Sequence, residues 1–159
     1  MRAFHIPAAG AAPQLSHLAA PAPGPGQVSV RLHACGLNFA DLLMVQGRYQ
    51  DTPDAPFTLG MEAAGIVQST GPGVSGLEPG QRVAVFSGQG GLAEEGVFEA
   101  AAVLPVPDSM PFEHAAAFQI AYGPSHMALD HCARLQPGER LLVTGAAGGV
   151  GLTAVEIGK

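Results

Sequence analysis

The sequence predicts an α+β fold, in which a small, mainly β domain is followed by the beginning of an alternating α/β unit. Glycine (22) and proline (14) are frequent among the 159 residues, which favours many turns between short strands. Residues 27–34 alternate between apolar and polar side chains, as in a strand with one solvated face. After Pro107 the pattern changes to helices and then to an apolar segment with a glycine-rich turn.

The individual elements follow from this pattern. Turns rich in proline and glycine bound four expected strands, at residues 27–34, 62–69, 82–86 and 97–106. A short helical segment is expected at 38–45. In the second part we expect a helix at 113–119, an interruption at Gly123 and Pro124, a further helix to about Cys132 and a short strand at 140–144. The expected domains are therefore residues 1–120 and residues 121–159.

Composition and charge exclude several classes of function. The net charge of −6 and the lack of any Lys or Arg cluster argue against nucleic acid as a partner. No apolar run reaches the ~20 residues that cross a bilayer, and the N-terminus does not resemble a signal peptide, so no membrane association is expected. Cys35 and Cys132 are too few for a disulfide framework, which favours a cytoplasmic location.

The glycine-rich turn is the strongest candidate for a binding site. Residues 141–151 run from an apolar segment through small residues into a helix, where unpaired N–H groups and the helix dipole attract a pyrophosphate. Small residues let the phosphates approach the backbone, and Gly151 would allow close packing of helix on strand. A tight connection without ligand is the alternative. The residues expected to contact a dinucleotide here are Ala146, Ala147, Gly148, Gly149, Val150 and Gly151.

Four segments together resemble the zinc-independent quinone oxidoreductase branch of the medium-chain dehydrogenase/reductase superfamily. They are residues 35–43 (CGLNFADLL), 47–49 (GRY), 59–65 (LGMEAAG) and 143–151 (VTGAAGGVG). The resemblance implies a GroES-like, mainly β catalytic domain over residues 1–120 and the first strand, turn and helix of a Rossmann domain over residues 121–159. It further implies that the chain is the N-terminal portion of a longer protein, inactive alone and homodimeric at full length.

Departures from the zinc-dependent members of that superfamily bear on the chemistry. Asn38 stands where those enzymes carry Cys, and Met61 stands where they carry His. An amide and a thioether do not replace thiolate and imidazole as Zn²⁺ ligands, so no metal site is expected. Without a Lewis acid, a conjugated acceptor that spreads the incoming negative charge is the easier substrate.

The resemblance also assigns roles to side chains. Asn38, Asp41 and Tyr49 would line the nicotinamide end of the cleft, with Asn38 as an amide donor and Asp41 as an orienting group. Asp41 could instead be a helix-start carboxylate, and Tyr49 a half-buried core aromatic. Tyr122 would approach the cofactor, and Ser125 could replace the hydroxyl that Pro124 removes. Cys35 is expected to be a small core residue.

These observations predict an oxidoreductase that uses NADPH, with NADH as the other possible nucleotide, to reduce a quinone or an α,β-unsaturated carbonyl. Two alternative functions fit the same observations. One is a reductase of acryloyl-type (enoyl) thioesters, which needs the same conjugated acceptor. The other is a GroES-like binding or structural module without catalytic activity.

Overall fold

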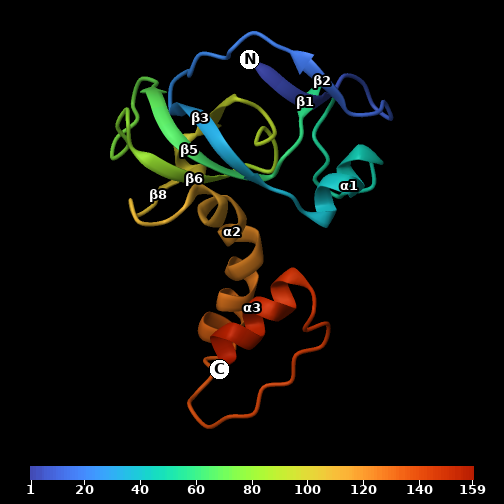
Figure 1. Cartoon of the computed structure of the whole chain (residues 1–159), viewed down its shortest axis with the longest axis vertical. Helices are drawn as coiled ribbons and strands as arrows, with labels where there is room; N and C mark the ends of the chain where they lie inside the picture. Colours follow the sequence, from blue (N-terminus) through green and yellow to red (C-terminus); the bar gives the residue numbers. More distant parts are fainter. The chain divides into compact units, whose positions relative to one another are not determined.

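The computed structural model describes residues 1–159, which divide into two compact units, Met1–Ala117 and Phe118–Lys159. Compactness alone assigns no function, so the catalytic and dinucleotide-binding domains expected on either side of residue 120 stay a prediction. The first unit contains two antiparallel sheets (Figure 1). The smaller has the strand order β2-β1-β4, formed by β1 (Arg2–Ile6), β2 (Gln14–His17) and β4 (Phe57–Thr58).

The larger sheet has five strands in the order β7-β3-β5-β6-β8. Its members are β3 (Gln27–Gly36), β5 (Glu62–Thr70), β6 (Arg82–Phe86), β7 (Glu95–Glu99) and β8 (Val103–Pro105). The predicted strands at 27–34, 62–69 and 82–86 are confirmed. The mainly β character expected for this part of the chain is confirmed as well.

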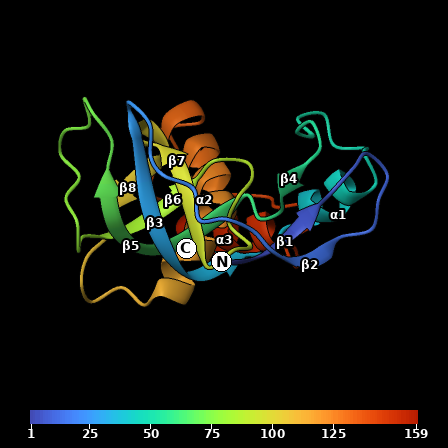
Figure 2. The ribbon, with the colours of Figure 1, turned by 90° about the horizontal axis from the view of Figure 1, so that it is seen from above.

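The predicted strand at 97–106 is wrong, because this segment forms two strands. A single 3₁₀ turn, η1 (Ala100–Ala102), separates β7 from β8. β7 pairs with β3 at one edge of the sheet, whereas β8 pairs with β6 at the other. A connection of this length spans at most about 14 Å, and the two edges of the sheet must therefore lie close together. As a result the sheet curls round on itself (Figure 2). Alternation along one segment does not reveal which strand it pairs with.

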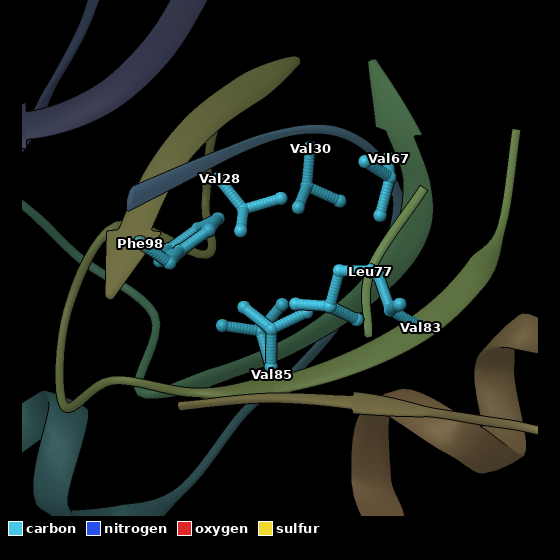
Figure 3. Packing of buried hydrophobic residues seen from close by; sticks show 8 residues of the cluster. Val28, Val30, Val67, Leu77, Val83, Val85 and Phe98 are labelled. Carbon is cyan, nitrogen blue, oxygen red and sulfur yellow. The ribbon is translucent and has the colours of Figure 1, made fainter. Parts of the chain in front are cut away.

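Apolar side chains from the larger sheet, with Leu77 from the loop between β5 and β6, fill the inner side of the sheet (Figure 3). Val28 and Val30 lie two residues apart on β3, so they point to the same face, and both are fully buried. Each such valine contributes on the order of 1.5–3 kcal/mol through burial. The cluster comprises Val28, Val30, Val67, Leu77, Val83, Val85, Phe98 and Val103.

A second, smaller cluster joins the sheet to the beginning of α2 (Phe112–His126). Ala64 and Ala84 on the strands meet Ala115 and Ala116 on the helix, and all four are buried. Alanine side chains let the helix backbone come close to the sheet. A Cβ at Gly36 would lie 2.6 Å from the carbonyl oxygen of Ala116, so this strand position also requires a residue without a side chain.

Helix α2 continues through the predicted interruption at Gly123 and Pro124. Proline removes one N–H donor and crowds the preceding turn, but here the helix tolerates it inside the last turn. The hydrogen-bond pattern widens directly afterwards: Met127–Cys132 is a π-helical segment, η2, and the N–H of Ala133 donates to the carbonyl of Ala128 at 2.9 Å. The predicted second helix is therefore a continuation with altered hydrogen bonding.

The last helix, α3 (Gly149–Gly158), follows the glycine-rich turn as predicted. The prediction of a strand at 140–144 is wrong, because Leu141–Val143 forms no strand in this structure. A strand needs a neighbour that completes its ladder hydrogen bonds, and neither of the two sheets includes this segment.

Candidate functional site

Helix α1 (Phe39–Val45) places two of the predicted site residues together. Asn38 precedes its first residue, and the Asn38 backbone N–H donates to Asp41 Oδ2 at 2.8 Å. The other carboxylate oxygen, Asp41 Oδ1, accepts a hydrogen bond from the N–H of Gly60 at 3.1 Å. Asp41 is 6% exposed. Its carboxylate thus caps the helix and ties it to the segment before β5, while a role toward substrate stays a prediction.

The Asn38 side chain lies against a second buried carboxylate. Asn38 Nδ2 donates to Glu62 Oε1 at 3.0 Å, and Glu62, the first residue of β5, is 3% exposed. An amide nitrogen carries two N–H groups, so this contact fixes the orientation of the amide and uses only one of them. Glu62 was not among the predicted site residues. The sequence signal that could have identified Glu62 is its position directly after Met61 in residues 59–65 (LGMEAAG).

Gly60 is the backbone position that makes this arrangement possible. Its φ is +96°, a conformation that side-chain-bearing residues rarely adopt. A Cβ at this position would lie 2.6 Å from the N of Leu92 and 2.7 Å from Cys35 Sγ. Only glycine can therefore present its N–H to Asp41 while passing so close to these two neighbours.

Cys35 borders the same site but is not activated by it. Burial raises the pKa of the Cys35 thiol to about 12, and the negative charges of Asp41 and Glu62 act in the same direction. The thiolate is the reactive form, so Cys35 is unsuited to act as a nucleophile near neutral pH. The expected role as a small packing residue agrees with this chemistry.

We expect thiol reagents to distinguish the two cysteines. Cys132 is exposed, whereas Cys35 is partly buried and has a raised pKa. At about pH 8, Ellman's reagent should modify one thiol rapidly in the native protein and both thiols in guanidinium chloride. Cys132→Ser should abolish the rapid phase. Rapid modification of Cys35 in the folded Cys132→Ser variant would contradict the assignment.

Tyr49 lies in a neighbouring pocket rather than in the hydrogen-bonded group. It is half-buried and lines a cavity of about 370 Å³ together with Met44, Met61 and Phe86. Met61 is 6% exposed. It directly precedes Glu62 in the sequence, so one lining residue of this cavity is the chain neighbour of the carboxylate that binds Asn38. A larger cleft of about 640 Å³ on the same unit has mostly apolar walls, with Asp41 among its lining residues. Asn38 and Asp41 are thus brought together. Tyr49 lies in a separate pocket, which it shares with Met61, the residue before Glu62.

The glycine-rich turn lies in the second unit and leaves the start of α3 open. Gly148 precedes the helix, and its N–H donates to the carbonyl of Gly145 at 3.0 Å. A Cβ on Gly149 would have no neighbour within 4 Å, so nothing covers the backbone there. Ala146 and Ala147 are exposed. The unpaired N–H groups of the first turn can therefore receive a phosphate, as the dinucleotide prediction requires.

Gly151 has a different neighbour from the one expected. A Cβ there would lie 2.2 Å from the carbonyl oxygen of Gly145 and 2.9 Å from the Cα of Ala146. The position requires glycine because the turn itself folds back over the helix, whereas the sequence suggested packing against a strand.

Tyr122 and Ser125 both reach from α2 to α3. The Tyr122 hydroxyl donates to Glu156, which raises the pKa of the phenol, and its ring stacks on Phe118 at a centroid distance of 5.0 Å. The Ser125 hydroxyl donates to the carbonyl of Val150 at 2.7 Å, and Ser125 is 2% exposed. Direct contact of either side chain with a cofactor stays a prediction.

Comparison with known proteins identifies a matching domain family and several relatives of this chain. Residues 24–108 match the family described as the alcohol dehydrogenase GroES-like domain. The human synaptic vesicle membrane protein VAT-1 homolog is 48% identical over 87% of this chain, which spans 35% of that protein. The quinone oxidoreductase-like protein 2 homolog of Nematostella vectensis is 46% identical over 84% of this chain, which spans 37% of it.

A solved structure extends the comparison to the fold. The quinone oxidoreductase from Thermus thermophilus, whose structure is also known as a complex with NADPH, superimposes with a TM-score of 0.83 at 38% identity. The match covers 99% of this chain and 49% of that protein. The chain belongs to the alcohol dehydrogenase GroES-like domain family.

Proposed function

We propose that this chain is part of a zinc-independent, NADPH-dependent oxidoreductase that reduces a quinone or an α,β-unsaturated carbonyl. Oxidoreductase relatives support the reaction class. The observation that carries the finer proposal is the pair Asn38 and Met61. Asn38 donates its amide to Glu62, and Met61 offers a buried thioether, so neither position supplies the thiolate or imidazole of a zinc centre.

The glycine-rich turn fits the diphosphate of a nicotinamide nucleotide. Small residues at 145–149 keep side chains away from the open first turn of α3, and the helix dipole favours negative charge there. A bound NADPH would supply the hydride. NADPH rather than NADH follows from the family resemblance, and the relative solved with NADPH supports it.

The side chains of the first unit would manage the charge that develops on the acceptor. Asn38 has one N–H held by Glu62 and a second available to donate to an oxygen that becomes anionic. Asp41 holds the start of α1 in place through two backbone N–H groups. Tyr49 contributes a phenol to a pocket in which Met44, Met61 and Phe86 form an apolar wall that suits a flat, conjugated substrate. Asp51, Ser87 and Glu99 also line this pocket.

A substrate and chelator series tests the proposal. The natural gene product that contains this chain should oxidise NADPH with a quinone or an enone, and incubation with a chelator should leave the rate unchanged. Reduction of an unconjugated ketone, together with stoichiometric zinc by elemental analysis, would contradict it. A marked preference for an enoyl thioester over quinones would select the thioester reductase instead. Failure to bind NADPH or NADH would favour a non-catalytic module.

Location and assembly belong to the same proposal. None of the helices is long and apolar enough to cross a membrane. Cys35 and Cys132 are unpaired, which is compatible with a reducing compartment, and we propose a cytoplasmic location. We also propose that the full-length protein is a homodimer, on the basis of the family resemblance. Light scattering on the natural gene product measures its oligomeric state directly.

A further inference from the structure

Two buried hydroxyl groups join α2 to the first turn of α3. Ser125 Oγ lies 2.7 Å from the carbonyl oxygen of Val150 and 2.8 Å from Thr153 Oγ1. Thr153 Oγ1 in turn lies 2.8 Å from the carbonyl oxygen of Ala121 and 2.9 Å from that of Val150. Ser125 is 2% exposed and Thr153 is 5% exposed. Neither hydroxyl is presented to solvent.

The two hydroxyl protons must be shared among these contacts. Ser125 and Ala121 belong to α2, whereas Val150 and Thr153 belong to α3, so only the contact of Thr153 with Val150 stays within one helix. Ser125 can donate to Val150 while Thr153 donates to Ala121, or the two hydroxyls can form a chain that ends at either carbonyl. Each of these arrangements links the helices and leaves no hydroxyl without a partner.

A hydrogen bond to the Val150 carbonyl affects the backbone at the start of α3. It belongs to the same planar peptide unit as the N–H of Gly151, and in a trans peptide these two groups point in opposite directions. The N–H of Gly151 lies in the first turn, before Leu152, whose N–H makes a bond to Gly148 O at 2.8 Å. A hydrogen bond that fixes the Val150 carbonyl therefore also fixes the direction of a free N–H at the helix start.

We propose that Ser125 and Thr153 are positioning residues, which hold the Val150–Gly151 peptide so that the glycine-rich turn is preorganised for the cofactor's diphosphate. Neither hydroxyl contacts the nucleotide. The proposal rests on the proposed function for the identity of the ligand. It gives Ser125 a role different from direct cofactor contact, because burial and two hydrogen-bond partners occupy its hydroxyl.

Variants of both residues in the full-length gene product test this role. Ser125→Ala and Thr153→Ala should each raise the Kd for NADPH about tenfold, because the peptide must be reordered when the ligand binds. KM for NADPH should rise in parallel, with kcat at saturating NADPH close to wild type. Thr153→Ser keeps the hydroxyl and should retain near wild-type affinity.

Glu156→Ala is the matched control. It removes the other hydrogen bond between α2 and α3, from Tyr122, without touching the first turn. Its Kd for NADPH should stay within about twofold of wild type. Loss of affinity in Ser125→Ala but not in Thr153→Ala would indicate a direct contact by Ser125 and overturn the paired role. Lower thermal stability with unchanged Kd would indicate a purely structural role and overturn it as well.

Hydrogen exchange separates this proposal from the proposed function. In the nucleotide-free protein, the amide of Leu152 should exchange about tenfold faster in both alanine variants than in wild type or Glu156→Ala. Unchanged exchange would overturn the positioning role. Faster exchange in a protein that binds no nicotinamide nucleotide would uphold the positioning of the turn and refute the proposed function.

Discussion

Replacing Gly151 with alanine is expected to weaken NADPH binding roughly 10- to 100-fold and to destabilise the protein by about 2 kcal/mol. The new Cβ would lie 2.2 Å from the Gly145 oxygen and 2.8 Å from the Gly145 carbonyl carbon. Both atoms are backbone, so no side chain can rotate away and the turn has to open. Opening the turn displaces the N–H groups that would meet the diphosphate. Nucleotide titration and urea denaturation of the same samples measure the two effects.

Gly123→Ala is the control for this substitution. Gly123 lies inside α2, and a Cβ at this position would have no neighbour within 4 Å. The alanine variant should therefore gain up to about 1 kcal/mol of helix stability. It removes a glycine from the same compact unit without a backbone clash. If Gly151→Ala bound NADPH as tightly as wild type, the turn would not be the diphosphate site.

The main strands were predictable because their signal is local. Val28 and Val30 alternate with polar residues on β3, and both are buried as that alternation predicts, although Ser29 between them is buried as well. The division of residues 97–106 was not predictable in the same way. Only the pairing of β7 with β3 and of β8 with β6 reveals it, and pairing partners are not encoded within one segment. The strand expected at 140–144 was wrong for a related reason, since a ladder requires a neighbour.

The candidate site shows the same division between local and distant information. Asn38 and Asp41 are three residues apart at a helix start, so their contact follows from spacing. The contact of Asn38 with Glu62 depends on the register of β3 and β5, which pairs Gly36 with Glu62. That register cannot be derived from a single sequence.

Thr153 was missed because of the break expected in α2. An interruption at Pro124 would leave the direction of Ser125 undefined, and no partner for its hydroxyl could then be sought. The continuous helix instead places Ala121 and Ser125, four residues apart, on one face beside α3. The consequence of a proline inside a helix depends on packing around it, which local propensity does not include.

Asp41→Ala should lower the free energy of unfolding by about 3 kcal/mol, because two N–H groups lose their acceptor in a largely buried site. The donors are the backbone N–H groups of Asn38 and Gly60, at 2.8 and 3.1 Å. Asp41→Asn retains one oxygen acceptor and should cost less than the alanine variant, although its NH₂ group then faces a second donor. Urea denaturation measures both variants. Asp54→Ala, which removes an exposed carboxylate, should change stability by less than about 0.5 kcal/mol.

The asparagine variant also separates a positioning role from a catalytic one. If Asp41 only anchors α1, the activity of Asp41→Asn should follow the folded fraction, and kcat measured well below its unfolding temperature should approach the wild-type value. If the charge of Asp41 acts on the acceptor or the nucleotide, kcat should fall even where the protein is fully folded. Two backbone donors already occupy the carboxylate, one at the helix start and one before β5. We therefore expect the first result, because an oxygen that holds the backbone in place is not available to exchange a proton with substrate.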